Sequence, residues 1–256
     1  MEELIDYGRN QLGIKDVQTW DLSFISEKLR EAKFSYSENE VKQYFTEPAV
    51  LKGMFGLVEK MFSIKIKEEK TPVWNDDVKF FVIEDKEGKE IAGFFMDLYA
   101  RSGKRGGAWM NDQISRREVN GKIQKPIAYL VCNFAAPVGD NPSLLTLRDV
   151  ETIFHEFGHG LHHMLTRQTE LAVSGISGVE WDAVEMPSQF MENFVLNWDV
   201  MQTITHHVKT GKTMPRELFD KLVAAKNYGA GMANVRQIEF ALFDMLLHMD
   251  THPEKD

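Results

Sequence analysis

Apolar and polar positions follow three successive patterns along the chain. Residues 1–75 carry apolar side chains three and four positions apart, the spacing of one helix face, and residues 148–250 return to it. Between them, residues 76–136 hold short runs rich in valine, isoleucine and phenylalanine, which are typical of β-strands. No repeat, low-complexity tract or flexible linker separates the regions. We therefore predict a mainly α fold with a small β-sheet, without a domain boundary inside residues 1–256.

Capping residues mark the helix starts of the first region. Asp21 precedes a segment with helical periodicity, and Ser37 with Glu40 has the spacing of a capping box. Pro48 suits the first turn of a further helix, because its missing N–H has no helical partner there. These signals predict helices that begin near each of these positions.

The middle region predicts a hairpin and one more strand. Residues 78–84 and 91–99 are rich in β-forming residues, and the turn between them contains Gly88. Residues 127–134 form the next strand-like run, between two prolines. The loop 102–107 is basic and glycine-rich but does not match the phosphate-binding pattern GxxxxGK[ST], so we interpret it as a flexible loop.

The last region predicts further helices, over residues 149–167, 181–198, 215–225 and 232–249. The last of these is so rich in apolar residues that we predict a buried helix. Its apolar residues are Val235, Ile238, Phe240, Leu242, Phe243, Leu246 and Leu247.

Composition and charge exclude several classes of partner. Lys and Arg number 30 and Asp and Glu 39, a formal net charge of −9, so nucleic acids and anionic membranes are poor partners. No uncharged apolar run approaches the roughly 18 residues of a membrane span, and the N-terminus lacks the features of a secretory signal. The single cysteine, Cys132, has no internal disulfide partner, which favours a reducing, cytoplasmic setting.

The segment from His155 to His159 reads His-Glu-Phe-Gly-His, the pattern H-E-x-x-H. On a helix the two histidines share one face, about 6 Å apart along the axis, and can hold one Zn²⁺. Glu156 is rotated by about 100° and suits a general base for a water that the metal activates. The competing interpretation is a chance match on a wet helix face. Apolar flanks instead favour a buried helix whose polar groups need partners, and Gly158 and Gly160 indicate close packing.

A third ligand has to come from outside this motif. The metzincin extension requires glycine at position 162 and histidine at 165, but the chain has His162 and Leu165. His162 shares the helix face yet lies about 10 Å along the axis from His155, too far to join both histidines on one ion. We interpret His162 as a supporting or substrate-facing residue, or as a structural histidine.

Carboxylates for the third position lie in the predicted helix 181–198. Asp182, Glu185, Gln189 and Glu192 form one polar stripe on an otherwise apolar helix. The stripe is either a solvated face or a buried set of polar groups. A carboxylate from it would complete a site of two histidines and one acid, and the spacing leaves Asp182, Glu185 and Glu192 open.

Longer motifs surround these residues, at 154–163, 173–178, 181–193, 97–101, 104–110 and 236–240. In these motifs the chain resembles the thimet oligopeptidase family of zinc peptidases. The resemblance implies a zincin-like (gluzincin) metallopeptidase catalytic domain, of which residues 1–256 are one portion. It also implies that one Zn²⁺ per chain is bound by His155, His159 and Glu185. Glu156 would be the general base, and Asp182 would support a ligand histidine.

The resemblance implies hydrolysis of internal bonds in short peptides. In this family the active site lies at the floor of a deep channel, which admits short unstructured peptides and excludes folded proteins. The strand Tyr129–Ala135 would be the sheet edge that pairs with the peptide backbone. Substrate contacts are then expected at Asn133, Phe134 and Ala135, and at His162.

The chain also departs from the family, whose members are much longer. They continue into a tyrosine- and glycine-rich loop that supplies oxyanion-stabilising tyrosines, and the chain contains no such loop. Residues 227–231 look similar, but their place before Arg236 assigns them to another helix, so we give Tyr228 no catalytic role. The alternative function is an incomplete or inactive fragment that binds zinc and peptides without cleaving them, either as a monomer or with a companion segment. Helices facing the missing part would expose apolar surface.

Overall fold

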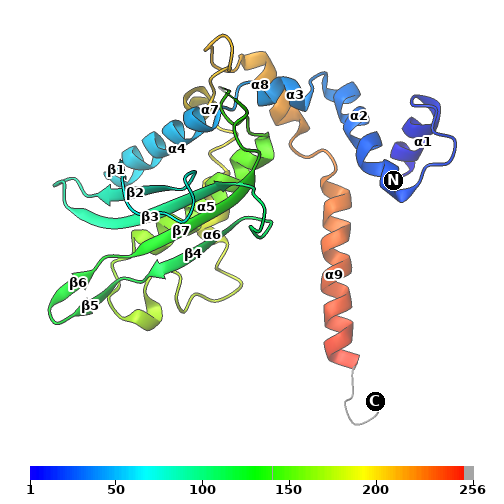
Figure 1. Cartoon of the computed structure of the whole chain (residues 1–256). Helices are drawn as coiled ribbons and strands as arrows, with labels where there is room; N and C mark the ends of the chain where they lie inside the picture. Colours follow the sequence, from blue (N-terminus) through cyan, green and yellow to red (C-terminus); the bar gives the residue numbers. More distant parts are fainter. Residues whose placement is uncertain (140, 251–256) are drawn as a thin grey trace. The chain divides into compact units, whose positions relative to one another are not determined.

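The structure is a computed structural model that describes residues 1–139 and 141–250. It divides into two compact units (Figure 1). The first unit combines Met1–Ser37 with Arg216–Asp256, and the second comprises Glu38–Pro215. The expected combination of helices with a small sheet is confirmed. That residues 1–256 form one portion of a catalytic domain stays a prediction.

A five-stranded sheet lies at the centre of the second unit, and a two-stranded ribbon accompanies it. The strands are β1 (Lys65–Glu69), β2 (Lys79–Glu84), β3 (Glu90–Tyr99), β4 (Trp109–Ile114), β5 (Arg117–Val119), β6 (Lys122–Gln124) and β7 (Ile127–Phe134). Their order is β1-β2-β3-β7-β4, with β5 and β6 paired separately. Neighbours run antiparallel except β3 and β7, which run parallel. The predicted hairpin and the following strand are confirmed as β2, β3 and β7.

Two predictions about the strands are wrong. The region 1–75, predicted to be helical, contains strand β1. Residues 129–134 of the run 129–135, which was predicted as a sheet edge, belong to β7. This strand lies between β3 and β4, so the edges are β1 and β4. β7 is buried along most of its length, as an interior strand is, whereas the middle of β4 is exposed. A strand's own residues do not show which distant segments pair with it, and this is why the edge was misassigned.

Helices α4 (Glu47–Phe62) and α5 (Leu147–Met164) cover one face of the sheet through a cluster of aromatic rings. The ring of Phe55 in α4 lies 5.1 Å from that of Phe81 in β2 and 5.6 Å from that of Phe157 in α5. Phe94 of β3 lies 5.5 Å from Phe157. This packing holds α5 against the sheet. The shorter helices of this unit are α3 (Glu38–Lys42), α6 (Met186–Glu192) and α7 (Trp198–Ile204).

Helix α6 is shorter than the predicted helix 181–198. It begins at Met186, with Glu185 at the N-cap and Pro187 in the first turn. The residues before it form turns, in which the Ala183 N–H donates to the Glu180 carbonyl at 3.0 Å. Proline has no N–H to donate to an upstream turn, so it suits the start of a helix and not its interior.

The first unit contains α1 (Glu2–Asn10), α2 (Leu22–Phe34), α8 (Arg216–Ala225) and α9 (Ala230–Asp250). Leu4, Ile25 and Leu29 form its small buried core. Tyr228 packs in this unit, and its hydroxyl donates to the Ser26 carbonyl at 2.9 Å. These contacts give Tyr228 a structural role in the turn between α8 and α9.

Helix α9 contradicts the prediction of a buried helix over 232–249. The helix forms, but its large apolar side chains are exposed, with Val235 and Phe243 both 68% exposed. An apolar pattern makes burial favourable, but it does not supply the surface that a helix packs against.

Candidate metal centre

Helix α5 carries the H-E-x-x-H motif between the sheet and α6. Thr146 caps its start: the Thr146 hydroxyl accepts from the Asp149 N–H at 3.1 Å, and the Asp149 carboxylate accepts from the Thr146 N–H at 2.9 Å. The motif glycines permit the close packing that the sequence indicates. A Cβ on Gly158 would stand 2.5 Å from the Pro187 carbonyl oxygen, and one on Gly160 would stand 3.0 Å from a leucine of β7. Gly158 therefore lets the backbone of α6 approach the motif directly.

Three side-chain atoms converge at the exposed side of α5. His155 Nε2 and His159 Nε2 each lie 3.1 Å from the same oxygen, Glu185 Oε2. All three atoms lie within 4.8 Å of one another, and the described part of the chain holds no other group of this kind. Ligands of a tetrahedral zinc ion, each about 2.0–2.1 Å from it, stand about 3.3 Å apart. The spacing and the donor set therefore fit one Zn²⁺.

The start of α6 places the carboxylate of Glu185. The buried Ser188 hydroxyl donates to the Glu185 carbonyl at 2.8 Å and lies 3.0 Å from Glu185 Oε2. The Glu185 side chain is 50% exposed, so the cluster opens to solvent. Of the three carboxylates that spacing left open, Glu185 is the one that reaches both histidines.

Glu192, and not Asp182, contacts a histidine of the cluster on the side of its ring that faces away from Glu185. Glu192 Oε1 lies 2.6 Å from His155 Nδ1, the ring nitrogen opposite the one that faces Glu185. Asp182 is exposed, and no hydrogen bond or ion pair of Asp182 appears among the described residues. The turn over 181–185 explains the difference, because Asp182 lies before the helix whereas Glu192 lies on it. Glu192 stands seven positions after Glu185, two helical turns on the same face, and this spacing was the available signal.

Glu156 lies beside the cluster with 6% of its surface exposed. Burial raises the pKa of its carboxyl to about 7, with His155 and a hydrogen bond from the Met110 backbone opposing the rise and Glu185 adding to it. Burial also lowers the pKa of His159, which favours the neutral imidazole that a metal ligand requires. A carboxyl with a pKa near neutrality is suited to taking and returning a proton.

The residues at the end of β7, and Ala135 just after it, were predicted to contact substrate, and they make contacts inside the protein. The Asn133 amide donates to two carbonyls of the loop 102–107, at 2.8 and 2.7 Å. Phe134 is buried, and the Ala135 carbonyl accepts from a serine hydroxyl at 2.6 Å. The loop 102–107, which we interpreted as flexible, is thus anchored to β7. A substrate role for Asn133, Phe134 and Ala135 stays a prediction.

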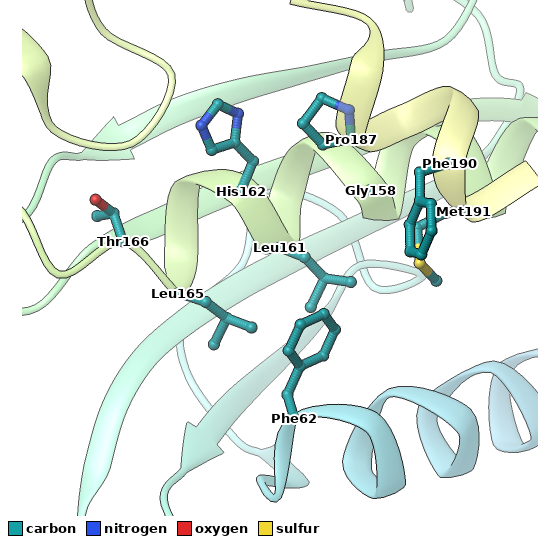
Figure 2. A pocket seen from close by; sticks show the side chains of 9 residues that line it. All are labelled: Phe62, Gly158, Leu161, His162, Leu165, Thr166, Pro187, Phe190 and Met191. Atoms are coloured by element: carbon teal, nitrogen blue, oxygen red, sulfur yellow. The ribbon is translucent and has the colours of Figure 1, made fainter.

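His162 lies away from the three converging atoms. It lines an apolar cavity of about 300 Å³ together with Phe62, Leu161 and Phe190. Figure 2 shows its ring turned away from Phe62 and Leu161. Burial lowers the pKa of His162, which favours its neutral form. Its predicted contact with substrate stays a prediction.

Comparison with known proteins gives consistent results along the whole chain. The sequence model of peptidase family M3 matches residues 1–256. Oligopeptidase A of Escherichia coli is 46% identical over 257 residues, which cover 100% of this chain and 38% of that protein. Organellar oligopeptidase A of Arabidopsis thaliana is 47% identical over 257 residues, covering 97% of this chain and 32% of that protein. Saccharolysin of Saccharomyces cerevisiae is 32% identical over 248 residues, which cover 93% of this chain and 35% of that protein.

These matches confirm the family resemblance carried by the motifs, including the likeness to bacterial oligopeptidase A. The chain spans under two fifths of the length of the curated relatives it matches. The motif residues therefore have counterparts in longer proteins.

Proposed function

Because the chain belongs to peptidase family M3, we propose that it forms the zinc-binding part of a metalloendopeptidase that hydrolyses internal bonds of short peptides. The observation that carries this proposal is the convergence of His155, His159 and Glu185, with Glu156 beside them. Two relatives, 46% and 45% identical to this chain, carry the name oligopeptidase A. This name supports short peptides as the substrate class. The domain type we propose is zincin-like, of the gluzincin kind.

His155, His159 and Glu185 would hold one Zn²⁺ per chain. Two imidazoles and one carboxylate form the donor set of catalytic zinc sites, whereas structural sites are closed by four protein ligands. When bound, the ion lowers the pKa of water towards about 7 and polarises a carbonyl group. The exposed side of Glu185 leaves room for a substrate to approach.

Glu192 and Ser188 orient the proposed ligands. Glu192 would accept a hydrogen bond from the Nδ1–H of His155. In that tautomer the lone pair is on Nε2, the nitrogen that faces Glu185. Ser188 holds the Glu185 carboxylate by a hydrogen bond to Oε2. We therefore propose Glu192 as the carboxylate that supports a ligand histidine. The same role for Asp182 stays a prediction without a contact behind it.

Glu156 would act as the general base and then as the general acid. Its carboxyl takes a proton from the attacking water and later gives it to the amine of the departing peptide. Both transfers are favourable near neutral pH, because burial holds its pKa close to 7. The Met110 backbone of β4 favours the ionised form of this carboxyl, because it opposes the rise in its pKa.

We propose that β4, and not β7, is the strand that pairs with the peptide. β4 lies at the edge of the sheet, and the residues in its middle are exposed. An extended peptide can add to such an edge through backbone hydrogen bonds. The contact between the β4 backbone and Glu156 would bring the bound peptide alongside the proposed base.

We place the protein in the cytoplasm, with peptides as its partners and without nucleic-acid or membrane partners. The net charge of −9 and the Arabidopsis relative named probable cytosolic oligopeptidase A support this proposal. None of the described helices has both the length and the apolar character needed to cross a membrane. A monomer or an association with a companion segment stays the expected state.

The test combines zinc content with cleavage of an internally quenched short peptide. We expect the protein to bind one zinc per chain and cleave the peptide, and Glu156→Gln to keep the zinc but lose about 10²-fold or more in kcat. Glu180→Gln, an exposed residue before α6, is the control and should match the wild type. Cleavage by Glu156→Gln at the wild-type rate would contradict the proposed mechanism.

The same experiment tests the alternative of a fragment that binds without cleaving. The observation that favours this alternative is the short span of the chain relative to its relatives, 38% of the E. coli protein. It predicts bound zinc and measurable peptide binding with no turnover, even when Glu156 is intact.

A further inference from the structure

The charged group of Lys104 lies inside the five-stranded sheet. Its side chain is 5% exposed, although it belongs to the glycine-rich loop between β3 and β4. Its Nζ donates to the backbone carbonyls of Tyr99 at 2.8 Å and Cys132 at 2.6 Å. The backbone carbonyl and the carboxylate of Asp97 lie 2.9 and 2.8 Å from the same Nζ, so its three N–H groups are shared among four acceptors. The ammonium therefore joins β3 to β7 from within the sheet.

These carbonyls lie where the pairing of β3 with β7 is irregular. Asp97 pairs with Val131 but Tyr99 pairs with Phe134, so β7 holds one more residue than β3 between these pairs. A bulge of this kind leaves carbonyls without their usual partners in the neighbouring strand. Buried carbonyls without a donor are costly, and Lys104 supplies the missing donors.

Asp97 balances the charge of Lys104. Arg101 donates to its two carboxylate oxygens at 2.6 and 2.8 Å, and Trp74 Nε1 donates at 2.9 Å. Burial alone would raise the pKa of Asp97, but the hydrogen bonds from Arg101, Lys104 and Trp74 outweigh burial and lower its pKa to about 2. Asp97 and Lys104 therefore form a charge pair at neutral pH, buried and fully hydrogen-bonded.

The loop that carries Lys104 leads directly into β4. Lys104 holds the middle of the loop, and the Asn133 amide holds two further loop carbonyls. β4 begins immediately after these anchors, with Trp109 paired to Val131. The position of β4 along β7 therefore depends on the anchored loop.

β4 in turn contacts α5, the helix that carries the residue proposed as the base. The buried His163 Nε2 of α5 lies 3.0 Å from the Ile114 carbonyl oxygen of β4. The Met110 backbone of β4 also acts on Glu156, because it lowers the pKa of that carboxyl. A shift of β4 would therefore change the surroundings of the Glu156 carboxyl.

We propose that Lys104, in its ion pair with Asp97, is a positioning residue that sets β4 against Glu156. It acts through the anchored loop and the β4 backbone, and it touches no reacting atom. The inference rests on the proposed function, in which Glu156 is the general base. It adds a link between a charge pair buried in the sheet and the alignment of the proposed base on the neighbouring helix.

Lys104→Met tests this link, because methionine keeps a long unbranched side chain but removes the ammonium. We expect zinc content per chain to stay unchanged and kcat per bound zinc to fall about 10²-fold, as a small misplacement of a catalytic group does. The matched control is Lys67→Met, which removes an ion pair with Glu84 of 2.6 Å in β1 and β2, away from β4. The control should keep its kcat. An effect on folding alone would lower zinc content and activity together, leave kcat per bound zinc unchanged, and overturn the proposal.

A double variant asks whether Lys104 acts together with Asp97. When two residues act as a unit, removing either one removes their joint effect, so removing the second adds little further loss. Asp97→Asn combined with Lys104→Met should therefore reduce kcat per bound zinc by about as much as either substitution alone. Losses that multiply in the double variant would contradict the pair.

Hydrogen exchange supplies a readout that does not depend on activity. Lys104→Met should speed amide exchange in β4 and leave β2 as slow as in the wild type. Unchanged exchange in β4 would overturn the proposal. If the wild type cleaved no peptide while Lys104→Met still speeded exchange in β4, the proposed function would fail and the positioning of β4 by Lys104 would be supported.

Discussion

The second unit contains two clusters in which electron-donating atoms converge, and they differ in where the positive charge comes from. In the candidate metal centre, His155, His159 and Glu185 bring three such atoms within 4.8 Å of one another, and the Glu185 side chain is 50% exposed. In the sheet, backbone carbonyls and the Asp97 carboxylate converge on the ammonium of Lys104, where both side chains are 5% exposed.

The difference between the two clusters separates a binding site from a structural pair. Lys104 provides the cation of the sheet cluster, and burial closes that cluster to solvent. Among the described residues, no lysine or arginine pairs with Glu185, so a cation that bound the other cluster would have to come from solution. An exposed set of converging donors can exchange ligands, whereas a buried and satisfied pair can only hold its surroundings in place.

The largest effect is expected from removing the carboxylate of Glu185 in the candidate metal centre. Glu185→Ala deletes the oxygen that both histidines face, so zinc affinity should fall by clearly more than the roughly 10–100-fold typical of lost outer partners. The loss of zinc affinity in Glu192→Ala should lie within that roughly 10–100-fold range, because Glu192 contacts only one of the two histidines, His155. Competition with a chelator of known affinity measures both effects.

Glu180→Ala is the control for this series. Glu180 precedes α6 and makes no contact with either histidine, so zinc affinity should stay at the wild-type value. Equal losses in all three variants would remove the reason for assigning the ligand role to Glu185.

An intermediate effect is expected at the contact that brings α6 to the motif. Gly158→Ala would place a Cβ 2.5 Å from the Pro187 carbonyl oxygen, a backbone atom that cannot move without shifting α6. We expect a loss of about 3 kcal/mol in the free energy of unfolding, at the upper end for overpacked sites. Zinc affinity should fall as well, because α6 carries Glu185 at its start. Urea denaturation and zinc titration check the two expectations.

Gly56→Ala provides the matched control within α4. A Cβ there would have no atom within 4 Å, so the substitution should raise the free energy of unfolding by about 0.5–1 kcal/mol through helix propensity. If Gly158→Ala were tolerated as well as Gly56→Ala, the close approach of α5 and α6 would not be needed for stability.

The smallest effect, a change in the free energy of unfolding, is expected from protonating Asp97 in the sheet cluster. The pKa of Asp97 is about 2 in the folded protein and about 3.9 in an unfolded chain. Its ionised form therefore stabilises the fold fully above both values, and this contribution, about 2 kcal/mol, is lost as the pH falls towards 2. The free energy of unfolding of the wild type minus that of Asp97→Asn should shrink correspondingly in acid.

Asp76→Asn, at an exposed aspartate, is the control for this titration and should show a nearly constant difference. A difference for Asp97→Asn that did not change with pH would show that the pair with Lys104 is not an ionic one.

Part of the candidate metal centre could be predicted from local spacing. His155 and His159 share a helix face because helix geometry repeats every 3.6 residues or so, and the structure keeps them together. The third ligand was harder to predict, because the spacing along the stripe could not choose between Asp182, Glu185 and Glu192. The choice depended on where α6 begins, and Pro187 sets that start.

Other features could not be predicted because they depend on contacts between distant segments. The anchored loop 102–107 depends on Lys104 reaching carbonyls of β3 and β7, and nothing in the loop itself indicates this. β4 is an edge of the sheet because β7 pairs with both β3 and β4, whereas the resemblance had implied that the run 129–135 was the edge. Likewise, the apolar residues of α9 predicted burial, but burial needs a partner surface as well as a pattern.

The sequence by itself determined many of the helices, the three strands β2, β3 and β7, the H-E-x-x-H motif and the family, because each follows from short-range periodicity or from contiguous motifs. Only the tertiary structure decided that Glu185 faces both histidines, that Glu192 stands behind His155 and that Lys104 is buried against Asp97. The physical reason is that hydrogen bonds and ion pairs form between atoms close in space. Which atoms those are depends on how α6, β4 and β7 pack, and the residues between them along the chain do not encode that packing locally.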